Sequence, residues 1–139
     1  MSAPHAVKAL ADLAEISSQI RAAVVFGGDD AVLGSTLDDE QQAERLAHAA
    51  RQLLQAAEAV RRDGSVRLAQ LEAATPEGSV FAVRDGERAI AAVTTPDPTV
   101  GLVFYDLKNC LRALGAAPPQ RPKRAARRAA AASESDAAA

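Results

Sequence analysis

Two glycines followed by two carboxylates form the part of this sequence with the clearest potential for chemistry. Gly27-Gly28-Asp29-Asp30 places two acidic side chains next to each other, and carboxylate oxygens are ligands that Mg²⁺ accepts. The same four residues suit a tight turn, because glycine reaches positive φ and aspartate hydrogen-bonds to nearby backbone. The further acidic and basic positions that a nucleotide-processing site needs do not accompany the motif, so we interpret it as a turn.

The remaining candidates for reactivity lack the partners that catalysis or metal binding needs. His5 and His48 have no cysteine or histidine at ligand spacing, and a single cysteine, Cys110, excludes an internal disulfide. The sequence contains neither a phosphate-binding glycine–lysine loop nor a Gly-x-Ser-x-Gly elbow. We therefore predict no catalytic residue, no cofactor site and no metal site, and a protein that is not an enzyme.

Charge is distributed unevenly along the 139 residues. Five basic residues follow Pro118 together with only two acidic ones, which leaves 11 basic and 16 acidic residues before it. This Ala/Arg-rich tail has no large apolar side chain, and we expect residues 117–139 to be disordered. Its cations offer nucleic acid or an anionic surface a weak attraction through residues 121–128, although no aromatic residue is interleaved for base stacking.

Hydrophobic periodicity predicts eight elements between about residues 6 and 115. Ala6–Arg21 carries Leu10, Leu13, Ile16 and Ile20 at helical steps. The apolar runs Ala22–Phe26 and Val32-Leu33 flank the Gly/Asp turn and predict a hairpin, whose first strand is apolar at consecutive positions and so is expected to be covered on both faces.

The second half of this region predicts a long helix, three strands and a final helix. Thr36 or Asp38 is expected to cap the helix Asp38–Arg62, and Gly64 to end it. Strands are predicted at Val66–Ala73, Gly78–Arg84 and Arg88–Thr94, the last two joined by Asp85-Gly86. Asp97-Pro98 is expected to open the last helix. Its apolar stripe is Val100, Val103, Phe104, Leu107, Leu111 and Leu114, with Cys110 beside it and expected to be at least partly buried.

The long helix has more apolar surface than one sheet requires. On a helical wheel its alanine, leucine and valine residues occupy about half the circle, whereas a helix resting on one layer needs a stripe of about 100°. Since much of the surplus is alanine, which allows close approach of another backbone, we expect a second copy of the same helix across a two-fold axis. The alternative is that alanine merely reflects helix propensity and codon bias.

The sequence resembles Roadblock/dynein light chain domains over residues 6–115. The resemblance is carried by Leu13-Ala-Glu-Ile16, by Ala22-Ala-Val-Val-Phe26-Gly-Gly-Asp-Asp-Ala31-Val-Leu-Gly-Ser-Thr36, by Ala43-Glu-Arg-Leu-Ala47 with Leu53-Leu54, by Ser79-Val-Phe-Ala-Val83, by Ala89-Ile-Ala-Ala-Val93 and by Val100-Gly101-Leu102. The first turn has two more polar residues than the single Asp-Gly common in the family, the linker Arg62-Asp63-Gly64-Ser65 is shorter than many, and the basic tail is not a family feature.

This resemblance implies an α+β fold with three α/β/α layers and a five-stranded antiparallel sheet, in the order helix-strand-strand-helix-strand-strand-strand-helix. Residues 6–116 would form the domain, preceded by the extension 1–5 and followed by the tail 117–139. It also implies a homodimer through the second helix and the edge of the third strand. The residues assigned to that interface are Ala43, Leu46, Ala47, Ala50, Leu54, Ala57 and Leu68.

The expected function is that of a non-catalytic adaptor or regulator that binds a Ras-like small GTPase and modulates its GTP hydrolysis. The candidate partner surface is the polar side of the long helix, with Arg45, His48, Arg51, Gln52 and Gln55, although His48 also fits a plain solvated residue. Two alternatives stay open: a scaffold of a signalling or motility complex that leaves nucleotide turnover unchanged, and a nucleic-acid-associated protein acting through its tail. Without a signal-peptide core or an apolar run near 18 residues, the expected location is the cytoplasm.

Overall fold

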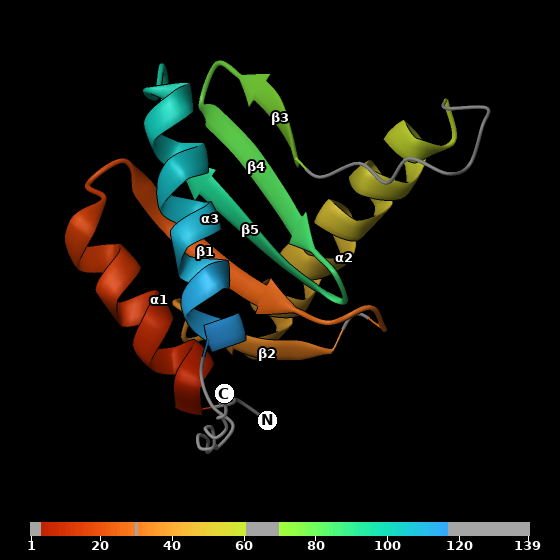
Figure 1. Cartoon of the computed structure of the whole chain (residues 1–139). Helices are drawn as coiled ribbons and strands as arrows, with labels where there is room; N and C mark the ends of the chain where they lie inside the picture. Colours follow the sequence, from red (N-terminus) through yellow and green to blue (C-terminus); the bar gives the residue numbers. More distant parts are fainter. Residues whose placement is uncertain (1–3, 30, 61–69, 117–139) are drawn as a thin grey trace, which may run out of the picture.

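A computed structural model describes residues 4–29, 31–60 and 70–116 of the chain (Figure 1). Its eight elements follow the predicted order of helices and strands. In chain order they are α1 (Pro4–Ile16), β1 (Ile20–Phe26), β2 (Val32–Ser35), α2 (Glu40–Glu58), β3 (Gln70–Thr75), β4 (Gly78–Asp85), β5 (Arg88–Thr94) and α3 (Val100–Ala116).

One antiparallel sheet of five strands, in the order β2-β1-β5-β4-β3, separates the helices into two layers. Figure 1 shows α1 and α3 side by side on the near face of the sheet and α2 on the far face. The predicted α+β fold with three α/β/α layers and an antiparallel sheet is confirmed.

The two faces of the sheet hold two separate cores. On one face, Val25, Phe81 and Ile90 pack against α1 and α3, and the rings of Phe81 and Phe104 meet edge to face with centroids 4.9 Å apart. On the other face, Val24, Phe26 and the small side chains of β4 and β5 pack against α2. Strand β1 is buried on both faces, as its consecutive apolar residues predict.

The first helix is shorter than predicted, because its expected last turn belongs to the sheet. Helix α1 ends at Ile16, and Ile20 begins β1 opposite Thr94 of β5. Ile20 is therefore not part of the helical stripe. The β-branched and apolar run from Ile20 to Phe26 completes its backbone hydrogen bonds in the sheet, which outweighs the helical spacing of the leucines before it.

Helix α1 begins at Pro4, before its predicted start at Ala6, whereas helix α2 both begins and ends inside its predicted bounds. Its N-cap is Asp39, whose Oδ1 accepts from the backbone N–H of Gln41 at 2.9 Å, and neither Thr36 nor Asp38 takes this role. Thr36 is used elsewhere, because its hydroxyl accepts from the N–H of Ala23 at 2.9 Å and joins the end of β2 to β1. The predicted stop at Gly64 lies outside the described residues.

Three further boundaries differ from the prediction by a few residues. Strand β3 runs over Gln70–Thr75, and the predicted start at Val66 lies outside the described residues. Asp85 pairs with Arg88, so the tight turn consists of Gly86 and Glu87, with Gly86 at φ 65°. Helix α3 begins at Val100 and not at Asp97-Pro98: Asp97 has φ 54° and lies in the preceding turn, and Val103 N–H donates to the carbonyl of Thr99.

Candidate partner-binding surface on α2

Most residues that the sequence analysis assigned to a dimer interface lie inside the subunit. Ala43, Ala47, Ala50 and Leu54 pack on the sheet and are at most 2% exposed. A second copy cannot reach side chains that are already covered, so this part of the assignment is corrected. Leu46 and Ala57 are half-buried at the margin of the same core, and Leu68 lies outside the described residues.

A second apolar stripe on α2 faces outward. It consists of the half-buried Leu46 and the exposed Ala49, Leu53, Ala56 and Val60, the last of these just beyond the helix. Their spacing alternates steps of three and four, which places them along one side of a helix. Leu53 is 37% exposed and Val60 77%. The sheet therefore covers only part of the apolar arc, and about as many apolar residues remain available to another surface.

The five residues predicted to contact a partner all lie on α2 outside its packed side. Arg45, His48, Gln52 and Gln55 are exposed and Arg51 is half-buried. On the helical wheel, the outward apolar stripe separates these polar residues from the core on one side, and Arg51 adjoins the core on the other. Arg45 and Gln52 thus adjoin the outward apolar stripe on the helical wheel, whereas His48, Gln55 and Arg51 lie progressively further round the helix.

A hollow of about 250 Å³ lies at the C-terminal half of this surface. Arg51, Gln55 and Glu58 of α2 line it together with Arg84 of β4 and the turns between β1 and β2 and between β4 and β5. Glu58 and Arg84 form a half-buried ion pair that ties the helix to the sheet. Burial lowers the pKa of Arg84, and nearby Arg51 adds to the shift because two cations repel each other.

The described residues of the Gly/Asp segment after β1, Gly27 to Asp29, form a turn. The Asp29 carboxylate accepts from the N–H of Ala31 at 3.1 Å, and Gly27 N–H donates to the Ala31 carbonyl at 2.9 Å. Asp30 lies outside the described residues. Within residues 4–29, 31–60 and 70–116, no group of three or more acidic, histidine or cysteine side chains is placed to hold a metal ion.

The interface predicted from the sequence omitted most of the outward apolar stripe. The outward residues belonged to the predicted apolar half-circle, but Ala49, Leu53, Ala56 and Val60 were not part of the predicted interface. A signal was present, because the spacing of Leu46, Ala49, Leu53, Ala56 and Val60 repeats like a coiled-coil seam. The ion pair between Glu58 and Arg84 has no comparable signal, since it joins residues distant in the chain.

Comparison with known structures defines the class of fold: it is that of Roadblock/LC7 domains, as the resemblance implied. A Roadblock/LC7 domain from Streptomyces avermitilis superposes with a TM-score of 0.70 at 14% identity, over 84% of this chain and 97% of that one. At this identity the agreement concerns the arrangement of the backbone.

Among the individual structures of this fold is the gliding protein MglB from Thermus thermophilus. It has a TM-score of 0.68 and 17% identity, over 81% of this chain and 87% of that one. A structure of MglB in a tetrameric arrangement has a TM-score of 0.61 and 14% identity, over 84% and 91% of the two chains. No protein-family model matches the sequence, and no curated protein matches it. No helix of the described residues is long and apolar enough to cross a membrane.

Proposed function

We propose that this chain is a homodimeric, non-catalytic regulator that binds a Ras-like small GTPase and modulates its GTP hydrolysis. The observation that carries the proposal is the outward apolar stripe of α2, from Leu46 to Val60, next to a row of polar side chains. The likeness of the fold to MglB, a gliding protein, supports a regulatory role.

Homodimerisation is the first part of the proposal. An isolated soluble subunit gains nothing from a row of exposed apolar side chains, whereas two antiparallel copies of the stripe would cover each other. Ala49 and Ala56 alternate with Leu46 and Leu53 in this row. Small residues between large ones allow the leucines of one helix to fit over the alanines of the other.

The GTPase is the second part. A two-fold pair of α2 helices would present Arg45, His48, Gln52 and Gln55 of both subunits on one continuous polar surface. Long flexible side chains of this kind can bind the acidic and polar loops around a bound nucleotide. The regulator would then act by positioning the GTPase's own catalytic groups, since we assign no catalytic residue to this chain.

Sedimentation equilibrium tests the dimer. A Leu53→Asp variant is expected to shift the chain from dimer to monomer at micromolar concentration, because the new carboxylate would be buried without a partner. Gln41→Glu, an added charge on an exposed position of the same helix outside the stripe, is the matched control and should remain dimeric. A wild-type chain that sediments as a monomer would refute the homodimer.

Nucleotide turnover tests the regulatory role. Purified chain is titrated into the Ras-like GTPase encoded nearest to it, loaded with GTP, and phosphate release is followed. We expect faster release that a double variant, Arg45→Glu with Gln52→Glu, abolishes while leaving the dimer intact. Binding without any change in phosphate release would support the alternative of a scaffold, and absence of binding in both nucleotide states would contradict the proposal.

A further inference from the structure

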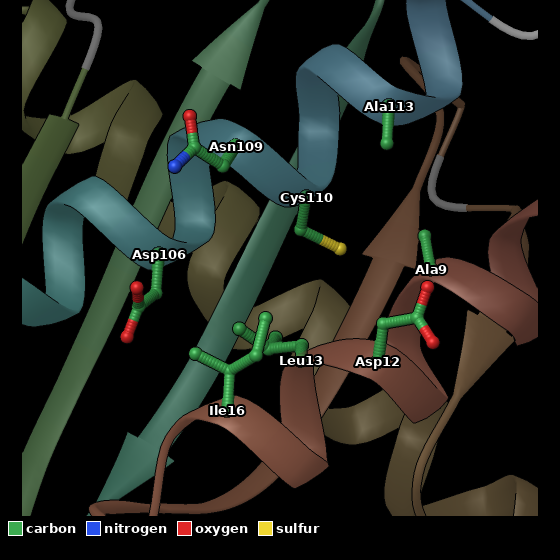
Figure 2. Close-up of a pocket in the computed structure, with 8 residues that line it drawn as sticks. All are labelled: Ala9, Asp12, Leu13, Ile16, Asp106, Asn109, Cys110 and Ala113. Carbon is green, nitrogen blue, oxygen red and sulfur yellow. The ribbon is translucent and has the colours of Figure 1, made fainter.

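A groove between α1 and α3, on the face of the sheet opposite α2, has features of a binding site. It has a volume of about 210 Å³. Figure 2 shows its lining residues projecting from the two helices, among them Asp12, Leu13 and Ile16 of α1 and Asp106, Asn109 and Cys110 of α3. The walls are mostly apolar, and Ile16 at one end is 70% exposed.

Asp106 is the most unusual residue of this groove. It is only 8% exposed, its carboxylate points into the space between the helices (Figure 2), and that carboxylate has no hydrogen bond or ion pair with another described residue. An ionised carboxylate that has lost most of its water needs a compensating charge or donor. The groove therefore favours a cationic ligand.

The other charged groups around the groove leave this requirement unmet. Asp12 lies on the opposite wall and pairs with the exposed Lys8 at 3.5 Å, an interaction that solvent weakens. Asn109 accepts from the guanidinium of Arg112 at 3.4 Å, and this pair is also exposed. The lining thus contains two carboxylates and no cation, and its apolar walls suit the methylene stem of a lysine or arginine with small side chains beside it.

The chain itself contains a segment of that composition. Residues 117–139 follow α3 directly, and Arg121, Lys123, Arg124, Arg127 and Arg128 alternate there with short runs of alanine and proline. Asp106 lies roughly 15 Å back along α3 from Ala116 at the helical rise of 1.5 Å per residue. An extended chain covers that distance in about five residues, so Arg121 to Arg124 can reach the groove.

We propose that the basic C-terminal segment of this chain binds in the groove between its own α1 and α3. A lysine or arginine head group pairs with Asp106 and Asp12, and the neighbouring alanines contact Leu13 and Ile16. The segment's cations would then be withheld from other anionic surfaces until salt or a competing polyanion displaces them. The proposal is independent of the partner that α2 binds.

Carbodiimide cross-linking of the full-length protein tests this arrangement, because the reagent joins a lysine amine to a carboxylate in contact with it. Lys123 is the only lysine after Ala116. We expect mass spectrometry to find Lys123 joined to Asp106 or Asp12. In a mixture of ¹⁴N- and ¹⁵N-labelled protein the joined peptides should carry the same isotope. Peptides of mixed isotope would mean that a second copy donates the segment, which overturns the intramolecular site.

Matched variants make the test specific. Asp106→Asn should lower the yield of the Lys123–Asp12 cross-link roughly fivefold or more, since a charge-assisted contact is lost. Glu44→Gln, which removes an exposed carboxylate of α2, should leave it unchanged. A cross-link pattern spread over the acidic residues of α2, or a yield that does not respond to Asp106→Asn, would overturn the proposal.

The Cys110 thiol supplies a second measurement that does not alter the folded core. Its sulfur faces the groove (Figure 2), so a bound segment shields it from iodoacetamide. Replacing the five basic residues of the segment by glutamine should raise the rate of alkylation severalfold at a fixed pH. The same rate in both proteins would count against occupancy of the groove by the segment.

Discussion

At the scale of single residues, one glycine and the single cysteine give the sharpest tests of the structure. Gly78 has φ +148°, and a Cβ there would overlap the carbonyl oxygen of Thr94 on the neighbouring strand. Gly101 in α3 has no such neighbour within 4 Å. Two glycines of the same domain therefore differ completely in what they tolerate.

Gly78→Ala is expected to lower the free energy of unfolding by about 2–4 kcal/mol, through backbone strain and through the clash with Thr94. Urea denaturation followed by circular dichroism measures the change. Gly101→Ala is the matched control, which should leave stability unchanged or raise it by up to about 1 kcal/mol, because alanine favours the helix. Equal effects at both positions would contradict the assigned backbone conformation.

Cys110 gives a prediction in pH. Burial raises the pKa of its thiol to about 11, and the negative charge of Asp12 adds to the shift. Alkylation of the folded protein should therefore accelerate with pH up to about 11, whereas in urea the midpoint should return to about 9. Since the folded pKa is the higher one, the thiol's contribution to stability is complete below pH 9 and is lost between pH 9 and 11. A midpoint near 9 in the folded chain would show that the thiol is exposed.

At the scale of elements, side-chain hydrogen bonds in the segment between β2 and α2 influence where α2 begins. Three polar residues lie between β2 and α2, namely Thr36, Asp38 and Asp39, and each is a good N-cap by residue type. Thr36 is held by Ala23 of β1, and the next residue to turn its carboxylate onto the helix is Asp39. Thr36 is thus engaged away from the helix by a contact between residues 13 positions apart in sequence.

Asp39→Ala should cost about 1 kcal/mol of stability, since the N–H of Gln41 loses its acceptor. Asp38→Ala is the control: it is exposed, carries the same charge and lies one residue earlier, and its effect should stay within about 0.5 kcal/mol. Thermal unfolding of the two variants in parallel gives the comparison. A larger loss for the Asp38 variant would mean that the helix begins earlier than described.

At the scale of the whole molecule, one sheet serves two cores. The same strands, β1, β4 and β5, supply side chains to both faces. Neither helical layer can lose its packing without exposing a face of these strands. We therefore expect the domain to unfold as one cooperative unit.

Leu54→Ala on the α2 face and Phe81→Ala on the opposite face test this cooperativity. Both side chains are at most 1% exposed, and the expected losses are about 2–5 and 3–5 kcal/mol. Hydrogen exchange should show lowered protection of β1 and β5 amides in both variants. Leu102→Ala, at a position 48% exposed, is the control with little effect. Loss of protection confined to α2 in the Leu54 variant would contradict a single unit.

The sequence by itself determined the elements, their order and the burial of β1 on both of its faces. The consecutive apolar residues of Ala22–Phe26 indicated a strand that is buried on both faces. The Asp85-Gly86 pair located a hairpin turn to within one residue. These features depend on neighbours in the chain, so local pattern is sufficient to find them.

Only the tertiary structure decided which half of the apolar arc of α2 meets the sheet. Periodicity gives the angle between side chains around a helix axis, but it contains no information on how the helix is rotated against a neighbouring layer. Ala47 and Leu53 look equally apolar in the sequence, yet one is fully buried and the other is 37% exposed. Asp106 illustrates the same limit, because its burial depends on α1, which lies some 90 residues earlier in the chain.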